Sequence, residues 1–386
     1  MAKICVAFYN GLYNSADKSI MPAWYEVFLS GLKEYGNELL IFSIPKFRQE
    51  YGEIDDETKN NILDFNPDLY IAFNNVFYNL DFLDCVQIAY EADTPIYWNN
   101  LEELKQSKKL ICIFGNGEAD YLRKLGIHSD RINIITPFTG VHFNDNNNPS
   151  INISFIGTRF GINRKEEMGY IAEIDETFRE DYFLCIQTIL NNPNVDIGEL
   201  RKIVKNKDII NYVDVSRILM MMSSEKRVRV LSSVVDLGLD LYGTDSWMYR
   251  YHFDTRLNMA YKNKKVYSLI HNEEIYNNSK IAINISHYQA KDSFSWRVLD
   301  IMASNACLVT DSWSGVKKTF PELNIPIYED EHQARYVCKK LLEDDSTRKE
   351  IVDSCHTIID KKYRFKHHLR ELEDISGVNL GTKNRI

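Results

Sequence analysis

Short runs of apolar residues, rich in β-branched and aromatic side chains, recur along the first half of the chain. Runs of this length and composition are typical of buried strands. They fall at residues 4–8, 39–42, 69–73, 95–98, 110–114 and 132–135. Helical patterns separate them, and the clearest covers residues 21–35, with Pro22 in its first turn and Gly36 just after its end. Strands that alternate with helices in this way predict a parallel, doubly wound sheet.

A second series of apolar runs follows the polar cluster NDNNNP at residues 144–149, which is typical of a linker. These runs fall at residues 151–158, 239–242, 281–285, 307–310 and 326–328. Between the first two of them, the residues from about 165 to 225 have mainly helical patterns. The sequence therefore predicts two α/β domains, residues 1–145 and 150–360, with a helical insertion in the second. Residues 361–386 are predicted to form a C-terminal helix and tail.

The stretch from Lys280 to Asp311 combines a strand, a polar loop, a helical pattern and a second strand in one βαβ unit. Ser295 precedes the helical pattern and is a candidate N-cap. In open α/β sheets, ligands bind beyond the carboxyl ends of the strands, and a helix N-terminus favours phosphate. Arg297 could bind phosphate oxygens, Asp300 a ribose diol, and Asp292 a sugar hydroxyl. These charges predict a nucleoside diphosphate sugar site, and the alternative is a solvated helix start without a ligand.

Two further strands of the second series end in glycine. Gly157 and Gly243 would let the backbone come close to a ligand, and Asp245 follows the second of them. A plain turn glycine is the alternative for Gly157. Arg164, a few residues after Gly157, could meet the phosphates, and its alternative is a surface arginine.

Composition and charge exclude several other classes of protein. A chain of 386 residues is too long for one ordinary core, and 46 basic against 55 acidic residues disfavour a nucleic-acid partner. There is no apolar run of about 18 residues, as a transmembrane helix needs, and the N-terminus lacks a signal-peptide cleavage site. The seven cysteines are scattered and none has zinc-ligand spacing, so we expect a cytoplasmic protein with reduced cysteines and no metal site.

The run RVLDIMA at Arg297–Ala303 resembles the "R-v-f-E-a-m-A" segment of GT-B glycosyltransferases, in particular the group-1 type that includes the CgeB-like spore-maturation proteins. In that group, two glutamates separated by seven residues belong to the donor site. Asp292 and Asp300 have this spacing, with aspartate at both positions. The run YNNSKI at Tyr276–Ile281 is similar to the lead-in of the same family, whereas the glycine that usually follows the helix is replaced by Ser304-Asn305-Ala306.

The resemblance implies the GT-B arrangement, two Rossmann-like domains that face each other across a cleft. It implies that the second domain holds a nucleotide sugar, which is a substrate and not a cofactor, and that the first binds a glycan or protein acceptor. It further implies metal-independent transfer that leans towards retention. We assign Asp292, Arg297 and His287 to the catalytic group, although a lone histidine can equally be structural. The assigned donor-binding residues are Gly157, Arg164, Gly243, Asp245, Asn284, Ser295 and Asp300.

Other functions stay open. A nucleotide-sugar epimerase of GT-B fold is one, and a non-catalytic sugar-nucleotide-binding module is another, because aspartate replaces glutamate at both positions. An inverting enzyme would need a base from the first domain, for which Glu102, Glu118 and His142 are candidates. Peripheral membrane association and the oligomeric state also stay open. His367 and His368 in the C-terminal segment are expected on a basic surface helix.

Overall fold

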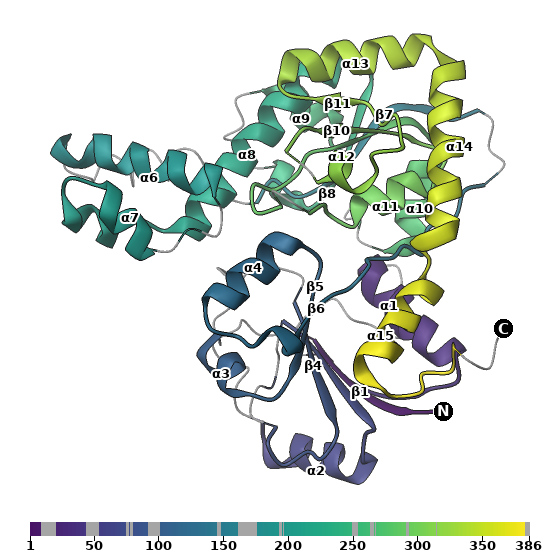
Figure 1. Cartoon of the computed structure of the whole chain (residues 1–386). Helices are drawn as coiled ribbons and strands as arrows, with labels where there is room; N and C mark the ends of the chain where they lie inside the picture. The colour runs from purple at the N-terminus through teal and green to yellow at the C-terminus, as the bar shows by residue number, and fades with distance from the viewer. Residues whose placement is uncertain are drawn as a thin grey trace. The chain divides into compact units, whose positions relative to one another are not determined.

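The computed structural model describes most of the chain. The described residues are 1–8, 21–43, 54–74, 77, 80–91, 101–144, 148–160, 176–192, 195, 197–248, 254–262, 266, 268–290, 293–313 and 315–382. The chain divides into two compact units (Figure 1). Unit 1 comprises Met1–Val141, Tyr267–His271 and Thr357–Ile386, and unit 2 comprises His142–Val266 and Asn272–His356.

Unit 1 is built on a six-stranded parallel sheet in the order β2-β1-β3-β4-β5-β6. Its strands are β1 (Lys3–Phe8), β2 (Glu38–Ser43), β3 (Leu69–Phe73), β4 (Val86–Tyr90), β5 (Leu110–Ile113) and β6 (Ile132–Ile134). The chain passes from β1 to β2 on one side and then to β3 on the other, so the sheet is doubly wound. Every residue of β3 is buried, as a strand with both faces covered requires.

The helices of unit 1 come from both ends of the chain. They are α1 (Ala23–Glu34), α2 (Asp56–Phe65), α3 (Leu101–Gln106), α4 (Asn116–Lys124) and the C-terminal α15 (Phe365–Ser376). Helices α1 and α15 pack closely. Gly31 of α1 makes this possible, because a Cβ at that position would lie 2.3 Å from the ring of Phe365. That ring also lies edge-on to Phe28 of α1, with centroids 5.9 Å apart. The last helix of the chain is therefore part of the first unit.

Unit 2 is built on a five-stranded parallel sheet in the order β11-β10-β9-β7-β8. Its strands are β7 (Ile151–Gly157), β8 (Leu239–Gly243), β9 (Ser279–Asn284), β10 (Cys307–Asp311) and β11 (Ile327–Tyr328). The order of the strands reverses between β7 and β9, which are neighbours in the sheet. The carboxyl ends of these two strands are therefore where a ligand is expected. Two parallel doubly wound sheets confirm the predicted α/β fold class.

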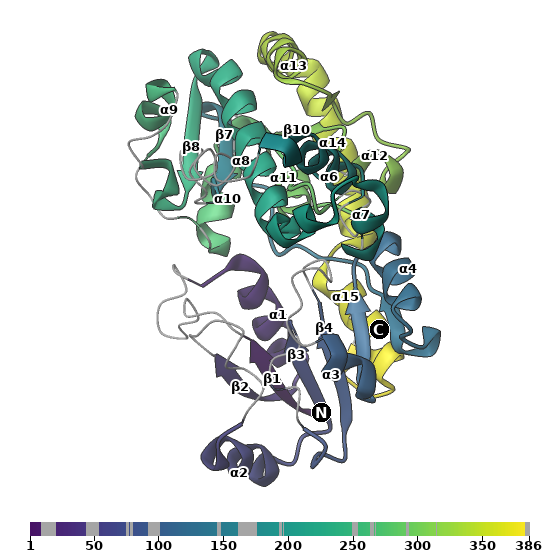
Figure 2. The same cartoon turned by 90° about the vertical axis from the view of Figure 1, so that its left-hand side faces the viewer.

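Nine α-helices belong to unit 2 and its connections in the described part of the chain. They are α6 (Arg179–Asn191), α7 (Ile197–Ile203), α8 (Val215–Val234), α9 (Thr255–Ala260), α10 (Leu269–Asn277), α11 (Arg297–Met302), α12 (Val316–Thr319), α13 (Glu331–Glu343) and α14 (Asp345–Lys362). The short 3-10 helix η8 (Asp245–Met248) follows β8. Helices α6 and α7 stand out from the sheet of unit 2 (Figures 1 and 2), where the sequence predicts a helical insertion.

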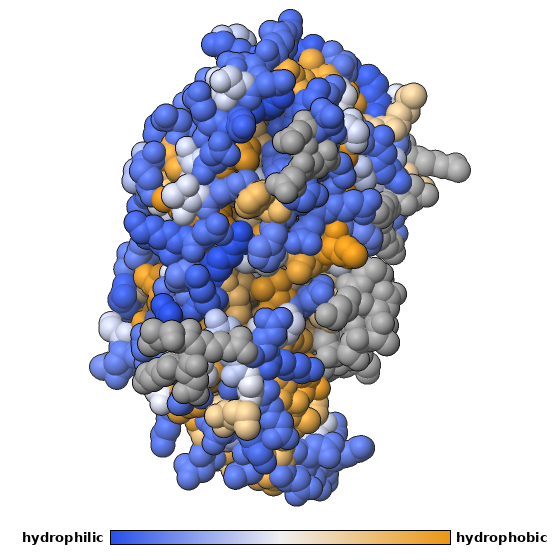
Figure 3. All heavy atoms as spheres, turned by 90° about the vertical axis from the view of Figure 1, so that its right-hand side faces the viewer, coloured by the Kyte–Doolittle hydropathy of each residue, from blue (hydrophilic) through white to orange (hydrophobic). Residues whose placement is uncertain are grey.

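The face drawn in Figure 3 is mostly hydrophilic, with hydrophobic areas between the hydrophilic ones. All seven cysteines are free and six of them are buried. Of the helices that the structure describes, none combines the length and the apolar character needed to cross a bilayer.

One strand of unit 1 was not predicted from the sequence. The sequence analysis does not predict β4 (Val86–Tyr90), because Gln87 interrupts its apolar run. In the structure the Gln87 amide donates a hydrogen bond to the Leu80 carbonyl oxygen at 3.1 Å, so it is not left without a partner. The strand predicted at residues 95–98 and the loop at Asn10-Gly11 lie outside the described residues.

The expectation that His368 lies on a surface helix is wrong, because the side chain is 0% exposed. Its Nδ1 donates to the Thr136 carbonyl oxygen at 2.7 Å, and its Nε2 accepts from the Tyr90 hydroxyl at 3.1 Å. The apolar residues Phe365, Leu369 and Leu372 recur at helical spacing on the buried face of α15, and His368 lies on the same face. Burial lowers the pKa of His368 to about 4, so the imidazole is neutral in the folded protein.

The buried His368 should make the protein less stable in mild acid. Its pKa in the unfolded chain is near 6.5, so the stability that neutral His368 contributes is present above that pH and is lost as pH falls towards about 4. The full effect is at most about 3 kcal/mol. We expect His368→Gln to reduce the loss of the urea midpoint between neutral pH and mild acid, and His367→Gln, at a half-exposed position, to leave it unchanged. Equal behaviour of the two variants would contradict this explanation.

Gly243 should be irreplaceable for two reasons at once. Its φ is +127°, and a Cβ would lie 2.2 Å from the Gly157 carbonyl oxygen on β7. Gly126 is a matched control, because its φ is +90° but its Cβ would meet nothing within 4 Å. Replacing Gly126 by Ala should cost about 1 kcal/mol of backbone strain, whereas Gly243→Ala should cost roughly 2–3 kcal/mol more, since the strands must shift. The urea midpoints of the two variants measure the difference, and equal midpoints would refute it.

Candidate functional site

Polar and charged side chains meet at the carboxyl ends of the central strands of unit 2. Asn284 is the last residue of β9, and Asp311 is the last residue of β10. Arg297 is the first residue of α11, which follows β9. Lys226 and Arg227 lie on α8, the long helix before β8. Fold topology thus brings residues that are far apart in the sequence to the place where an open α/β sheet binds its ligand.

Three of these side chains are cations, and we call Lys226, Arg227 and Arg297 the cation cluster. Both guanidinium groups lie against the ring of Phe155, at 5.6 Å from its centroid for Arg227 and 5.1 Å for Arg297. Burial lowers the pKa of all three cations, and for Arg227 the nearby charge of Arg297 adds to this effect. The cluster is therefore a place where positive charge is held away from water.

Arg227 is the most deeply buried member of the cluster, with 4% of its surface exposed. Its two terminal nitrogens donate to backbone carbonyl oxygens, one to Thr158 and the other to Ile285 at 3.4 Å. In the part of the chain that the structure describes, its buried Nε has no hydrogen-bond partner. The ring of Phe160 covers the guanidinium at 4.0 Å. A buried cationic donor without an acceptor is costly, and an anionic ligand would satisfy it.

The cluster is only partly neutralised by the protein. The Lys226 ammonium lies 2.7 Å from Oδ2 of Asp311, which also accepts a hydrogen bond from the Ser286 backbone N–H at 3.0 Å. Asp300, on α11, is the other carboxylate whose charge acts on Arg297. Three cations thus face two carboxylates, and the excess positive charge favours an anion such as a diphosphate.

Asn284 holds Arg297 in place. The side chain is 0% exposed, and its Oδ1 accepts from Nη1 of Arg297 at 3.1 Å. Its Nδ2 donates to the Thr310 hydroxyl at 2.9 Å, and its backbone carbonyl accepts from the Tyr328 hydroxyl at 2.9 Å. Asn284, predicted as a donor-binding residue, therefore contacts the guanidinium that would bind the phosphates.

The glycines at the strand ends make room for other parts of the protein. A Cβ on Gly157 would lie 2.9 Å from Nη2 of Arg297, so this glycine leaves space for the guanidinium. The Gly157 carbonyl oxygen accepts from the Trp247 indole at 2.7 Å and fills the space beside Gly243. Asp245 follows at the start of η8 and is exposed. The direct contact of these glycines with a ligand stays a prediction.

The start of α11 differs from the prediction in one respect. Ser295 is not the N-cap, because the helix begins one residue later and its N-cap is Trp296, without a side-chain hydrogen bond. The Ser295 hydroxyl instead donates a hydrogen bond to Oδ1 of Asn284 at 3.3 Å. Asp300 is 9% exposed and accepts from Nδ2 of Asn272 on α10 at 3.0 Å.

His287 follows β9 and lies beside the cluster. Its Nδ1 accepts from the Gln289 backbone N–H at 3.1 Å, and its ring is edge-on to Phe160 at 4.6 Å. Burial, with the charges of Arg227 and Lys226, lowers the pKa of His287 to about 3. An imidazole with so low a pKa is a weak base, so His287 is better suited to hydrogen bonding than to accepting a proton.

Some predicted residues cannot be placed in the site. Asp292 and Arg164 lie outside the described residues. Of the candidate first-domain bases, Glu102 is paired with Lys105 on α3 and is largely exposed. His142 lies in unit 2 and is 3.6 Å from Glu273.

The sequence analysis missed three residues of the site. Lys226, Arg227 and Asp311 were not candidates, although adjacent Lys and Arg on a helix before a strand, and an Asp at the end of a strand, are visible in the sequence. The missing information is the direction in which the helix presents its charges.

Comparisons with known proteins agree with this fold. Residues 225–374 match the protein family described as "Glycosyl transferase-like", and this segment contains the whole cation cluster and Asp311. No curated protein matches the chain.

Solved structures resemble the fold over almost the whole chain. The sucrose-phosphate synthase from Thermosynechococcus elongatus has a TM-score of 0.57 at 10% identity, covering 97% of this chain and 98% of its own. HepE of Anabaena, in complex with UDP and glucose, has a TM-score of 0.55 at 10% identity, covering 98% of this chain and 100% of its own. WaaG, a glycosyltransferase involved in lipopolysaccharide biosynthesis, has a TM-score of 0.51 at 9% identity, with 98% and 100% covered.

The fold is therefore the predicted GT-B fold, with two parallel doubly wound sheets. With the family match over residues 225–374, the chain is a glycosyltransferase.

Removing the amide that holds Arg297 should weaken anion binding. In Asn284→Ala the guanidinium loses its acceptor, and a hydrogen bond to a charged group contributes roughly 1.5–3 kcal/mol. We expect the dissociation constant for pyrophosphate, measured by isothermal titration, to rise by about tenfold or more. Tyr328→Phe, which removes only the bond to the backbone of Asn284, is the control and should have a smaller effect. Unchanged pyrophosphate affinity in folded Asn284→Ala would show that Asn284 does not position Arg297.

Proposed function

We propose that the protein transfers a sugar from a nucleoside diphosphate sugar, and that the cation cluster of Lys226, Arg227 and Arg297 binds the diphosphate. The observation that carries this proposal is the buried guanidinium of Arg227, whose Nε has no partner in the described part of the chain. A diphosphate offers several acceptor oxygens to the two arginines and the lysine at once. HepE, which shares the fold, is in complex with UDP and glucose, and this supports the same kind of donor here.

The rest of the donor would extend from the diphosphate along the ends of the strands. Asp300 and Asn272 lie together beside Arg297 on α11 and α10, and we assign Asp300 to the ribose hydroxyls. Gly243 and Asp245, at the end of β8, are assigned to the nucleoside. Gly157, Arg164, Ser295 and Asp292 complete the proposed donor site as the sequence predicts it, with Asp292 directed to a sugar hydroxyl.

The reaction follows from the charges of the site. The bond between the anomeric carbon and the phosphate oxygen breaks, and negative charge collects on the departing diphosphate. The oxygen of the acceptor hydroxyl bonds to the anomeric carbon, and its proton passes to an oxygen of the departing diphosphate. Cations held in a water-poor site stabilise the leaving group more in the transition state than in the bound donor. We propose that Arg227, Arg297 and Lys226 supply this stabilisation without a divalent metal ion.

The finer assignments rest on the sequence. We propose transfer with retention, because Asp292 and Asp300 have the spacing of the paired donor-site carboxylates. We propose that the acceptor is a glycan or a protein and that the first domain, residues 1–145, binds it. Kinship with the CgeB-like proteins rests on the segments Arg297–Ala303 and Tyr276–Ile281.

Donor turnover tests this function. Each of a set of UDP-, GDP- and TDP-sugars is incubated with the protein in the presence of EDTA, and release of the nucleoside diphosphate is measured with and without glycan acceptors. Arg227→Ala and Arg297→Ala should each lower kcat by about 10²–10³-fold, as loss of a transition-state donor does. Arg229→Ala is the matched control, because Arg229 lies on the same helix but is 57% exposed and pairs with Glu331.

The alternatives give different outcomes. A donor converted into an isomer that keeps its nucleotide would identify an epimerase. A rise in melting temperature with a nucleoside diphosphate but no turnover with any donor would identify a binding module. Near-normal turnover in Arg227→Ala would remove the cation cluster from the mechanism.

A further inference from the structure

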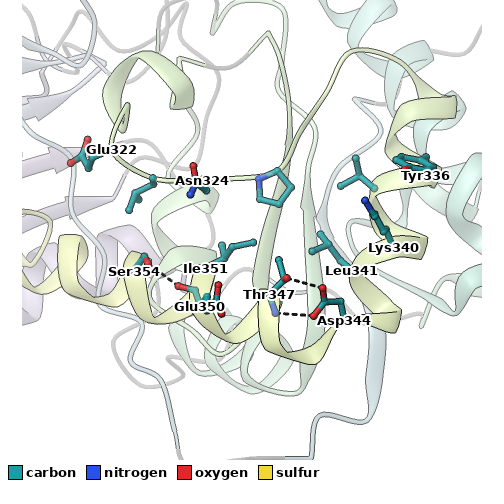
Figure 4. Close-up of a pocket in the computed structure, with 13 residues that line it drawn as sticks. Glu322, Asn324, Tyr336, Lys340, Leu341, Asp344, Thr347, Glu350, Ile351 and Ser354 are labelled. Carbon is teal, nitrogen blue, oxygen red and sulfur yellow. Dashed lines mark hydrogen bonds between the residues drawn. The ribbon is translucent and has the colours of Figure 1, made fainter.

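Unit 2 has a second candidate ligand site, which is separate from the cation cluster. A pocket with a volume of about 530 Å³ opens between α13, α14 and the chain segment 322–326 (Figure 4). It shares no lining residue with the donor site described above. Its volume is within the range of roughly 300–1,000 Å³ that is usual for small-molecule sites.

Three of the polar side chains that line this pocket have no partner in the part of the chain that the structure describes. Glu322, Asn324 and Glu350 line the pocket, and in the described residues their side chains make no hydrogen bond or ion pair. Asp344 differs, because its carboxylate accepts from the backbone N–H of Thr347 at 3.0 Å and from its hydroxyl at 2.7 Å, which caps α14. The first three side chains therefore offer carboxylate acceptors and an amide to a ligand.

An exposed aromatic ring stands on the α13 side of the pocket, near Lys340 and across the pocket from Glu322, Asn324 and Glu350 (Figure 4). Tyr336 on α13 lines the pocket and is 63% exposed, although large aromatic side chains are usually more buried. Leu341 and Ile351 lie between this ring and the polar groups, and both are buried, so the middle of the pocket has an apolar wall (Figure 4). A pocket with an open aromatic ring on one side and unpaired polar groups on the other suits a ligand with both C–H and O–H surfaces.

The charge of the pocket restricts the ligand further. Three carboxylates, Glu322, Asp344 and Glu350, face one ammonium, that of Lys340, so a phosphorylated or carboxylated ligand would be repelled. A cation at the face of Tyr336 is also disfavoured, because the Lys340 ammonium already lies 5.8 Å from the centroid of that ring. A neutral ligand that is rich in hydroxyl groups remains.

We propose that this pocket binds a neutral oligosaccharide. One pyranose ring stacks its C–H face on Tyr336, and hydroxyls of the oligosaccharide chain donate to Glu322 and Glu350 and accept from Asn324 and Lys340. The binding itself stands independently of the donor site. That the oligosaccharide is an acceptor or product chain, held while the donor site is reloaded, rests on the proposed glycosyltransferase function.

Isothermal titration without any nucleotide tests the proposal. The probes are cellohexaose, maltohexaose and chitohexaose, with spermine as a cationic probe. We expect at least one hexasaccharide to bind, and Tyr336→Ala and Glu350→Ala each to weaken it by about tenfold or more. Tyr212→Ala, at an exposed tyrosine of unit 2 outside the pocket, should leave binding unchanged. Both pocket variants alter exposed side chains, so their melting temperatures should match that of the unmodified protein.

Three results would overturn it. One is the absence of binding by every hexasaccharide at about 10 mM, a concentration that detects even millimolar affinity. Another is hexasaccharide binding that persists in Tyr336→Ala, which would locate it elsewhere. The third is binding of spermine alone, lost at high salt, which would make the pocket a cation site. Failure of this pocket and failure of the donor site can be told apart by the thermal shift that UDP produces in Tyr336→Ala. That shift depends on the cation cluster only, so it should persist in this variant whatever the hexasaccharides do.

Discussion

The feature on which the site of unit 2 depends is two guanidinium groups buried against one aromatic ring. Burial lowers the pKa of both arginines because the charged form loses its hydration, and for Arg227 the like charge of Arg297 adds to this effect. The protein holds them there with carbonyl oxygens for Arg227 and the Asn284 amide for Arg297. Lys226 brings a third positive charge, balanced by Asp311. Without a ligand this arrangement is unfavourable, and a bound diphosphate would convert it into a stabilising one.

The fold accommodates this arrangement at the point where the order of its strands reverses. Gly157 leaves space for Arg297, and Gly243 leaves space for the backbone of Gly157. Phe160, which covers Arg227, has a φ of +72°, a conformation that is rare for a residue with a bulky side chain. Such strained residues cluster at ligand sites, where surrounding contacts hold them in place. Strain, burial and unbalanced charge therefore fall in one place, and that place is the carboxyl edge of the sheet.

Much of the fold could be predicted from the sequence, because the strands are short, continuous apolar runs that periodicity detects. Strand β4 was missed where Gln87 interrupts such a run, and His368 was misplaced because a histidine among basic residues looks like a surface residue. Arg297 and Asn284 could be found because they lie next to a strand end. Lys226 and Arg227 could not, because on α8 the mixture of charged and apolar residues does not show which face packs on the sheet. That direction is decided by tertiary packing.

The most direct test of this account is a crystal structure of the protein with a bound nucleoside diphosphate, chosen as one that raises its melting temperature. The account predicts phosphate oxygens at about 3 Å from Nε of Arg227 and from the guanidinium of Arg297, with the Lys226 ammonium nearby. A diphosphate bound elsewhere in the protein, with Arg227 in contact only with protein and water, would contradict it.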